Sequence, residues 1–181
     1  MRIIAGSLKG RQLKSPTWAG LRPTSDKLRE TLFNVLSPRL AGARVLDAFA
    51  GTGALGIEAL SRGSTSVTFV ERDARAQALI ASNLERCGIG NGCVIIRSSV
   101  VRALATLRAG PAFVPFDIVL LDPPYDQTPE RILEDAETVV APDGVVVLEH
   151  ARRRGAPESA GRLVRRRQIA SGDSALALYT L

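Results

Sequence analysis

The sequence predicts an α/β fold built on a mostly parallel sheet. The centre of the chain alternates short β-branched runs with longer amphipathic segments, which is the rhythm of βαβ units. One run, residues 116–122, is almost wholly apolar, as a central parallel strand is when both of its faces are covered. With 181 residues, 45% apolar and 23% charged, the chain has the size and composition of one globular protein.

The expected strands, seven in all, are residues 43–49, 66–71, 93–97, 116–122, 145–150, 162–169 and 174–181. The expected helices of this region are residues 53–62, 73–87, 100–108 and 128–140. Asp73 is a suitable N-cap, and Gly63 and Gly88 allow the helices before them to end. The turn residues 142–144 precede the fifth strand. Because no helical segment separates the last two strands, we expect them to form an antiparallel hairpin at the sheet edge.

A smaller piece precedes this core. Residues 2–4 and 12–13 flank a glycine-containing turn, which predicts a small hairpin. The apolar residues that follow have helical spacing, namely Leu28, Leu32, Val35 and Leu36. Ser25 and Asp26 offer an N-cap for this helix, and Pro38 is expected to close it. We therefore expect a hairpin and helix appendage over residues 1–40 and one larger domain over residues 41–181.

Charge is distributed unevenly around the net value of +6. Residues 1–44 hold nine Lys or Arg against two Asp or Glu, and residues 150–181 hold seven against two. Residues 45–149 hold eight against fourteen. Two basic flanks around an acidic centre indicate a polyanionic partner, although solubility alone is a second reading. The arginine clusters at 152–154 and 165–167 fit phosphate contacts or a solvated face equally well.

Several classes of site are excluded by composition. The chain has two cysteines, Cys87 and Cys93, and one histidine, His150, too few for a Cys/His zinc site. His150 ends a strand-like run with no triad partners nearby, so we expect a structural role for it. No apolar run is long enough for a membrane span or a secretory signal, and a cytoplasmic protein is expected.

A glycine-rich loop carries the first motif. Gly51, Gly53 and Gly56 form G-x-G-x-x-G between a strand and a helix, Asp47 precedes them, and Glu71 ends the next strand. In dinucleotide enzymes the first glycine follows the strand directly and a pyrophosphate sits on the helix N-terminus. A carboxylate at Asp47 repels a pyrophosphate but attracts an ammonium group. The pattern therefore favours S-adenosylmethionine over NAD, with Glu71 on the ribose diol.

The tetrapeptide Asp122-Pro123-Pro124-Tyr125 is the second motif, directly after the apolar strand. Ligands of open α/β sheets bind at this end of the strands. An exocyclic base amine is a poor nucleophile because its lone pair is delocalised into the ring. The Asp122 carboxylate and the Pro123 carbonyl can accept its two N–H groups and orient the lone pair, and Tyr125 can stack on an extruded base.

These residues resemble the RsmD family of bacterial 16S rRNA guanine-N2 methyltransferases. The matching stretches are RIIAGSLKGRQL, RPTSDKLRETLFNVL, VLDAFAGTGALGIEALSRG, FVERD and LLDPPY, which lie within residues 2–125. The resemblance implies a class I S-adenosylmethionine-dependent methyltransferase (Rossmann-like) fold, with a seven-stranded mostly parallel sheet. It implies methyl transfer from S-adenosylmethionine to a guanine in 16S rRNA, at position 966. A short chain with few base-reading devices favours recognition of a preformed shape, so the expected substrate is the assembled 30S subunit or a late intermediate. Nothing in the sequence demands more than a monomer.

The resemblance also assigns residues to roles. It implies that the cofactor is bound by Asp47, Phe49, Gly51, Gly53, Glu71, Arg72 and Ser99. It implies that the target amine is handled by Asp122, Pro123, Pro124 and Tyr125 and the substrate by Arg22, Thr24, Asp26 and Arg29. In one departure, Ser98-Ser99 occupies the place where many relatives have Asp or Asn near the adenine.

Three alternatives stay open from the residues alone. A DNA adenine-N6 methyltransferase shares the Asp-Pro-Pro-Tyr motif, but the chain lacks an evident target-recognition insertion. A non-catalytic RNA-binding assembly factor could keep the fold, although the intact Glu71 and residues 122–125 argue against it. An NAD-dependent enzyme is disfavoured by Asp47.

Overall fold

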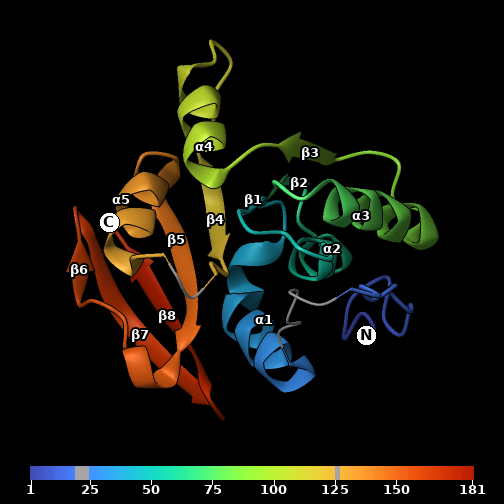
Figure 1. Cartoon of the computed structure of the whole chain (residues 1–181), viewed down its shortest axis with the longest axis horizontal. Coiled ribbons are helices and arrows are strands. Elements are labelled where there is room, and N and C mark those ends of the chain that lie inside the picture. Colours follow the sequence, from blue (N-terminus) through green and yellow to red (C-terminus); the bar gives the residue numbers. More distant parts are fainter. Residues whose placement is uncertain (19–24, 125–126) are drawn as a thin grey trace.

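The computed structural model describes residues 1–18, 25–124 and 127–181 and contains an eight-stranded sheet with helices on both faces (Figure 1). The strands are β1 (Arg44–Asp47), β2 (Ser66–Glu71), β3 (Cys93–Arg97), β4 (Phe116–Leu121), β5 (Val140–Ala151), β6 (Ser159–Ala160), β7 (Leu163–Ser171) and β8 (Ser174–Thr180). The helices are α1 (Asp26–Leu40), α2 (Ala54–Ser61), α3 (Ala74–Cys87), α4 (Val100–Ala109) and α5 (Pro129–Glu137), with a 3-10 turn η1 (Arg152–Arg154).

The strand order is β3-β2-β1-β4-β5-β8-β7-β6. Strands β1 to β5 pair in parallel, and β8, β7 and β6 continue the sheet in antiparallel fashion. The predicted parallel core and C-terminal hairpin are confirmed. Asp47 pairs with Phe69 of β2 on one side and Leu120 of β4 on the other. The chain order therefore switches direction at β1, the place where open α/β sheets bind ligands.

Two strand predictions were wrong in detail. The sheet has eight strands rather than seven, because two-residue β6 is too short to show any periodicity in sequence. Strand β5 begins at Val140, not Val145, and α5 ends at Glu137, before the predicted end of the helix. The register passes from Phe116–Val140 directly to Ile118–Val145, so the turn residues 142–144 lie in an irregularity of β5. Pairing with β4 on both sides of this irregularity recruits Val140 to the sheet.

Helix α1 continues through Pro38 to Leu40, although Pro38 was expected to close it. A proline in the last turn removes one hydrogen bond of the helix. Leu36 is 1% exposed and Leu40 is 2% exposed, so burial of the last turn outweighs that loss. Ser25 caps the other end of the helix, as predicted, by accepting the Leu28 N–H at 3.2 Å.

Each face of the sheet has its own buried cluster. One contains Leu32, Ile57 and Ile80 of α1, α2 and α3, packed on Phe69. The other lies beneath α4 and α5, the two helices that Figure 1 shows well apart from α1 to α3. Gly56 lets α2 approach β2, because a Cβ there would lie 2.2 Å from the Phe69 ring. This close approach fixes the glycine-rich loop that precedes α2.

Candidate functional site

Asp47 occupies the carboxyl end of β1 and is 2% exposed. Its Oδ2 accepts the Gly56 backbone N–H at 2.9 Å. Burial raises the pKa of this carboxyl to about 7, and the nearby Glu71 contributes to the increase. A buried carboxyl of this kind is poised to pair with a cation, because an incoming positive charge would offset the cost of ionising it.

The glycine-rich loop runs from Asp47 to α2 between the two flanking strands. Ala48 N–H donates to the carbonyl of Leu120 on β4 at 3.0 Å, and Ala50 N–H donates to the carbonyl of Val70 on β2 at 3.1 Å. Gly51 and Gly53 then adopt φ of 53° and 77°. Only glycine enters this region without strain, so the two glycines of the motif are required by the turn.

Glu71 holds this loop from the end of β2. Its Oε2 accepts the Gly51 N–H and its Oε1 accepts the Asp73 N–H, both at 2.9 Å. A carboxylate oxygen has two lone pairs, so each oxygen of Glu71 retains capacity for one further donor. A ribose diol supplies two such O–H donors, which fits the role predicted for Glu71.

The other residues predicted at the cofactor lie around the same edge. Phe49 is half-buried in the loop, and Arg72 is exposed directly after Glu71. Ser99 is exposed at the N-cap of α4, and its side chain makes no capping hydrogen bond. The neighbouring Ser98 donates its backbone N–H to the Glu71 carbonyl at 3.3 Å, which brings this turn to the end of β2.

The second motif follows β4 on the other side of β1. Asp122 and Pro123 are partly buried, and Pro124 is exposed. Asp122 thus lies one residue beyond β4, the strand that pairs with β1 as far as Asp47. Tyr125 lies outside the described residues. The two prolines line a cavity of about 510 Å³ between α5, the end of β5 and residues 154–157.

Of the four residues predicted to contact the substrate, the structure describes two. Arg22 and Thr24 lie outside the described residues. Asp26 is the exposed first residue of α1, and Arg29 is fully buried one turn later. The Arg29 guanidinium donates to Asp26 at 2.9 Å and to the Arg2 carbonyl at 2.6 Å, and burial lowers its pKa. Arg29 thus joins α1 to the N-terminal segment.

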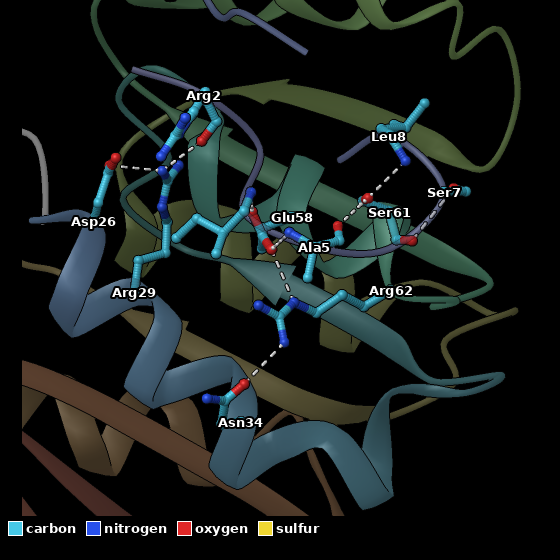
Figure 2. A network of polar contacts seen from close by, with 11 residues as sticks. Arg2, Ala5, Ser7, Leu8, Asp26, Arg29, Asn34, Glu58, Ser61 and Arg62 are labelled. Atoms are coloured by element: carbon cyan, nitrogen blue, oxygen red, sulfur yellow. Dashed lines mark hydrogen bonds and ion pairs between the residues drawn. The ribbon is translucent and has the colours of Figure 1, made fainter. Parts of the chain in front are cut away.

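Figure 2 shows how the N-terminal segment is attached to α2. Glu58, which is 0% exposed, accepts the backbone N–H groups of Ile4 at 2.8 Å and Ala5 at 3.0 Å. The same carboxylate accepts Arg62 Nε at 2.8 Å, and Ser61 Oγ donates to the Ala5 carbonyl at 2.6 Å. Sequence reasoning missed Glu58. The sequence indicated it only as one acidic residue within the otherwise apolar helical segment ALGIEALS.

Asn83 connects the same segment to the glycine-rich loop. This fully buried residue of α3 donates to the carbonyls of Thr52 at 3.0 Å and Lys14 at 3.2 Å. It also accepts the Lys14 N–H at 2.7 Å. The hairpin prediction is confirmed as one antiparallel bridge between Arg2 and Gln12. The N-terminal segment is therefore held against α2, which follows the glycine-rich loop, and α3, which follows β2.

The part of the chain that the structure describes contains neither a metal-binding cluster nor a membrane-spanning helix. Among residues 1–18, 25–124 and 127–181, no three His, Cys, Asp or Glu side chains are grouped so that they could hold a metal ion. Within the same ranges, every helix is too short or too polar to cross a membrane.

Comparisons with known proteins identify the family. The family model described as Conserved hypothetical protein 95 matches residues 1–180. YlbH of Bacillus subtilis (strain 168) is 40% identical over 99% of this chain and 98% of its own length. Ribosomal RNA small subunit methyltransferase D of Escherichia coli (strain K12) is 36% identical over 99% of this chain and 89% of its own.

A solved structure supports the same relationship. A hypothetical protein of Thermus thermophilus superimposes with a TM-score of 0.85 at 31% identity, covering 100% of this chain and 99% of that one. The match is to the whole chain, the N-terminal segment and the C-terminal hairpin included. The resemblance drawn from the motifs is thus confirmed, and the chain belongs to the Conserved hypothetical protein 95 family, the RsmD family.

Proposed function

We propose that this protein transfers a methyl group from S-adenosylmethionine to the exocyclic N2 amine of a guanine in 16S rRNA. The observation that carries the proposal is the convergence of three carboxylates on neighbouring strand ends. Asp47 ends β1, Glu71 ends β2, and Asp122 follows β4, while β1 lies between the other two strands. Two of these residues suit the cofactor, and the third suits an amine.

The residues present fit S-adenosylmethionine. Asp47 is a buried carboxyl whose ionisation an ammonium group would favour. The glycine-rich loop brings backbone close to the same place, and Glu71 keeps acceptor capacity for a ribose diol. S-adenosylmethionine supplies an electrophilic methyl group on a sulfonium. The protein contributes position and electrostatics, because no proton has to move before the methyl group is attacked.

Asp122 and Pro123 act on the acceptor in this proposal. The Asp122 carboxylate and the Pro123 carbonyl each accept one N–H of the amine, which directs the nitrogen lone pair toward the methyl group. Their partial burial strengthens these hydrogen bonds. After transfer, the amine carries an extra proton, and the Asp122 carboxylate, which already accepts one of its N–H groups, receives that proton and passes it to solvent.

The RNA target rests on family membership and charge. The relative from Escherichia coli carries the name of a small-subunit rRNA methyltransferase. The basic flanks supply phosphate contacts, the arginines of η1 are exposed, and Arg154 among them lines the cavity beside Pro123 and Pro124. We further propose that residues 1–40 act as an RNA-contacting appendage on the catalytic domain 41–181, and that a monomer methylates guanine 966 in the assembled 30S subunit.

A methyl-transfer assay tests the proposal. Purified protein and labelled S-adenosylmethionine are offered unmethylated 30S subunits, naked 16S rRNA and duplex DNA in parallel, and the modified nucleoside is identified by mass spectrometry. The expected product is N2-methylguanosine, with the 30S subunit as the better substrate. The Asp122→Ala protein, prepared identically, controls for a contaminating enzyme.

Other products would change the conclusion. N6-methyladenine in DNA would place the activity with the DNA enzymes that share the Asp-Pro-Pro-Tyr motif. Binding of S-adenosylhomocysteine and RNA without transfer to any substrate would favour a binding factor.

A further inference from the structure

His150 is a buried polar side chain that the proposed reaction does not use. It lies on β5, is 7% exposed, and is the only histidine of the sequence. Its Nδ1 lies 3.1 Å from the carbonyl of Ala151. Its Nε2, on the opposite side of the ring, is buried and has no hydrogen-bond partner among the residues that the structure describes. A buried nitrogen without a partner is costly and calls for an explanation.

The ring is placed beside the second motif. Strands β4 and β5 pair in parallel with Leu121 opposite Leu148. Two residues further along each chain, Pro123 and His150 both line the cavity of about 510 Å³. This volume is within the range of roughly 300–1,000 Å³ typical of small-ligand pockets. Pro123 therefore belongs both to the second motif and to the cavity that His150 lines.

The chemistry of Nε2 selects the kind of base. A carbonyl oxygen can only accept a hydrogen bond, so Nδ1 must carry the ring proton and donate it to Ala151. In a neutral ring Nε2 then has no proton and is an acceptor. Burial and the nearby Arg165 lower the pKa of His150, which keeps the ring neutral. Next to its exocyclic amine, guanine carries the N1–H donor, whereas adenine carries an acceptor at N1. A neutral Nε2 thus accepts from guanine and repels adenine.

We propose that His150 is a specificity-determining residue, whose Nε2 accepts the N1–H of the target guanine inside the cavity beside Pro123. This proposal rests on the proposed function for the identity of the base. Arg154 lines the same cavity, and its guanidinium would suit the O6 acceptor that guanine carries next to N1. Residues 154–157 form one wall of this cavity. Because Nε2 is closed to solvent, the proposal requires this wall to move when the base enters.

A binding experiment tests the contact without requiring methyl transfer. Because His150 is the single histidine, protein labelled with ¹⁵N-histidine gives one pair of ring nitrogen signals. Guanosine monophosphate is titrated in the presence of S-adenosylhomocysteine, with 2-aminopurine riboside monophosphate as the matched probe. This analogue keeps the 2-amine but has no proton on N1. The Nε2 signal is expected to shift as for an accepted hydrogen bond with the guanosine nucleotide only. Equal responses to both nucleotides, or none, would overturn the proposal.

A kinetic cycle gives the second measurement. Wild type, His150→Gln and His150→Phe are compared on rRNA fragments that carry guanine or 2-aminopurine at the methylated position. Wild type is expected to prefer guanine by roughly tenfold or more, because the analogue leaves a buried acceptor unpaired. His150→Phe should lose this preference, and His150→Gln, whose amide oxygen accepts, should keep part of it.

The outcomes separate this inference from the proposed function. Thermal melting and S-adenosylhomocysteine affinity check that each variant is folded. If His150→Phe does not fold, the wild-type titration alone tests whether Nε2 accepts the N1–H. An unchanged guanine preference in folded His150→Phe would overturn the role of His150 while methyl transfer to guanine stands. Absence of methyl transfer by wild type to any RNA would instead count against the proposed function.

Discussion

Asp47 Oδ2 accepts the backbone N–H of Gly56 at 2.9 Å, in a place where the carboxyl is almost completely removed from water. One hydrogen bond does not compensate a carboxylate for lost hydration, so the pKa of Asp47 rises to about 7. The same relationship ties the end of β1 to the first turn of α2, where Gly56 packs against Phe69. Ionising the buried Asp47 therefore lowers the stability of the folded protein, and a bound cation would offset part of that cost.

Asp47→Asn is expected to stabilise the protein in the absence of cofactor, increasingly so as pH rises. An unfolded aspartate titrates near pH 3.9, so wild type loses stability as pH rises from about 4 to about 7, where Asp47 must ionise inside the protein. Asparagine has no such cost. The gain in the free energy of unfolding should be near zero at pH 4 and at most about 4 kcal/mol at pH 8. Urea denaturation at several pH values checks this, and a pH-independent difference would contradict it.

Cofactor affinity should change in the opposite sense. Wild type needs an ionised Asp47 to pair with the ammonium group, so its affinity for S-adenosylhomocysteine should fall as pH drops below about 7. Asp47→Asn should bind more weakly at pH 8 and lose this pH dependence. Isothermal titration calorimetry from about pH 5.5 to about pH 8.5 measures both. A wild-type affinity that is flat with pH would show that Asp47 does not meet the ammonium group.

Asp122→Ala is expected to reduce kcat by about a hundredfold or more, because one of two acceptors for the target amine is lost. Asp122→Asn should retain measurable turnover, since its amide oxygen still accepts an N–H. Affinity for S-adenosylhomocysteine should stay within about twofold of wild type in both, as Asp122 acts on the acceptor only. Turnover of Asp122→Ala close to that of wild type would remove Asp122 from the mechanism.

Glu58→Ala is expected to lower the free energy of unfolding by about 3–5 kcal/mol, because it leaves the Ile4 and Ala5 N–H groups and the partly buried Arg62 without their acceptor. Glu58→Gln should cost less. Glu85→Ala, at an exposed position of α3, is the control and should change stability little. Limited proteolysis should cleave the N-terminal segment of Glu58→Ala first. If that segment stayed as resistant as in wild type, the attachment would depend on other contacts.

Gly56→Ala should destabilise the protein by about 2 kcal/mol or more, because the added Cβ would overlap the Phe69 ring. Gly90→Ala is the matched control, since Gly90 has open space around a built Cβ. Phe69→Leu should recover part of the loss when combined with Gly56→Ala, because it removes the clashing ring. Equal melting temperatures for Gly56→Ala and Gly90→Ala would show that α2 can move away from β2.

RNA binding should weaken steeply with salt if the basic flanks contact phosphates. Replacing the exposed Arg152, Arg153 and Arg154 by Gln should reduce the slope of log K against log salt by about one for each phosphate that is no longer neutralised. The exposed Arg131 lies in the acidic centre, and Arg131→Gln should leave the slope unchanged. Filter binding at several salt concentrations measures the slope, and identical slopes for all variants would place the RNA elsewhere.

Local sequence patterns predicted much of the fold. The apolar run before Asp122 and the β-branched runs at β1 to β3 predict buried parallel strands, because periodicity reflects which faces are covered. Capping residues at Ser25 and Asp73 predict helix starts for the same local reason. Tertiary pairing decided what these patterns could not: Val140 joined β5, β6 formed as an eighth strand, and α1 passed Pro38 because burial of Leu40 held its last turn.

The candidate site divides in the same way. Local patterns were enough to identify the chemical groups of the candidate site, since Asp47, Gly51 and Glu71 lie at strand ends and in glycine turns that such patterns reveal. Packing of the folded chain was needed to show that Glu58 holds the N-terminal segment and that Nε2 of His150 has no partner among the described residues. Hydrogen bonds between residues far apart in sequence have no periodic signature, and the burial that makes them matter exists only after the chain has packed.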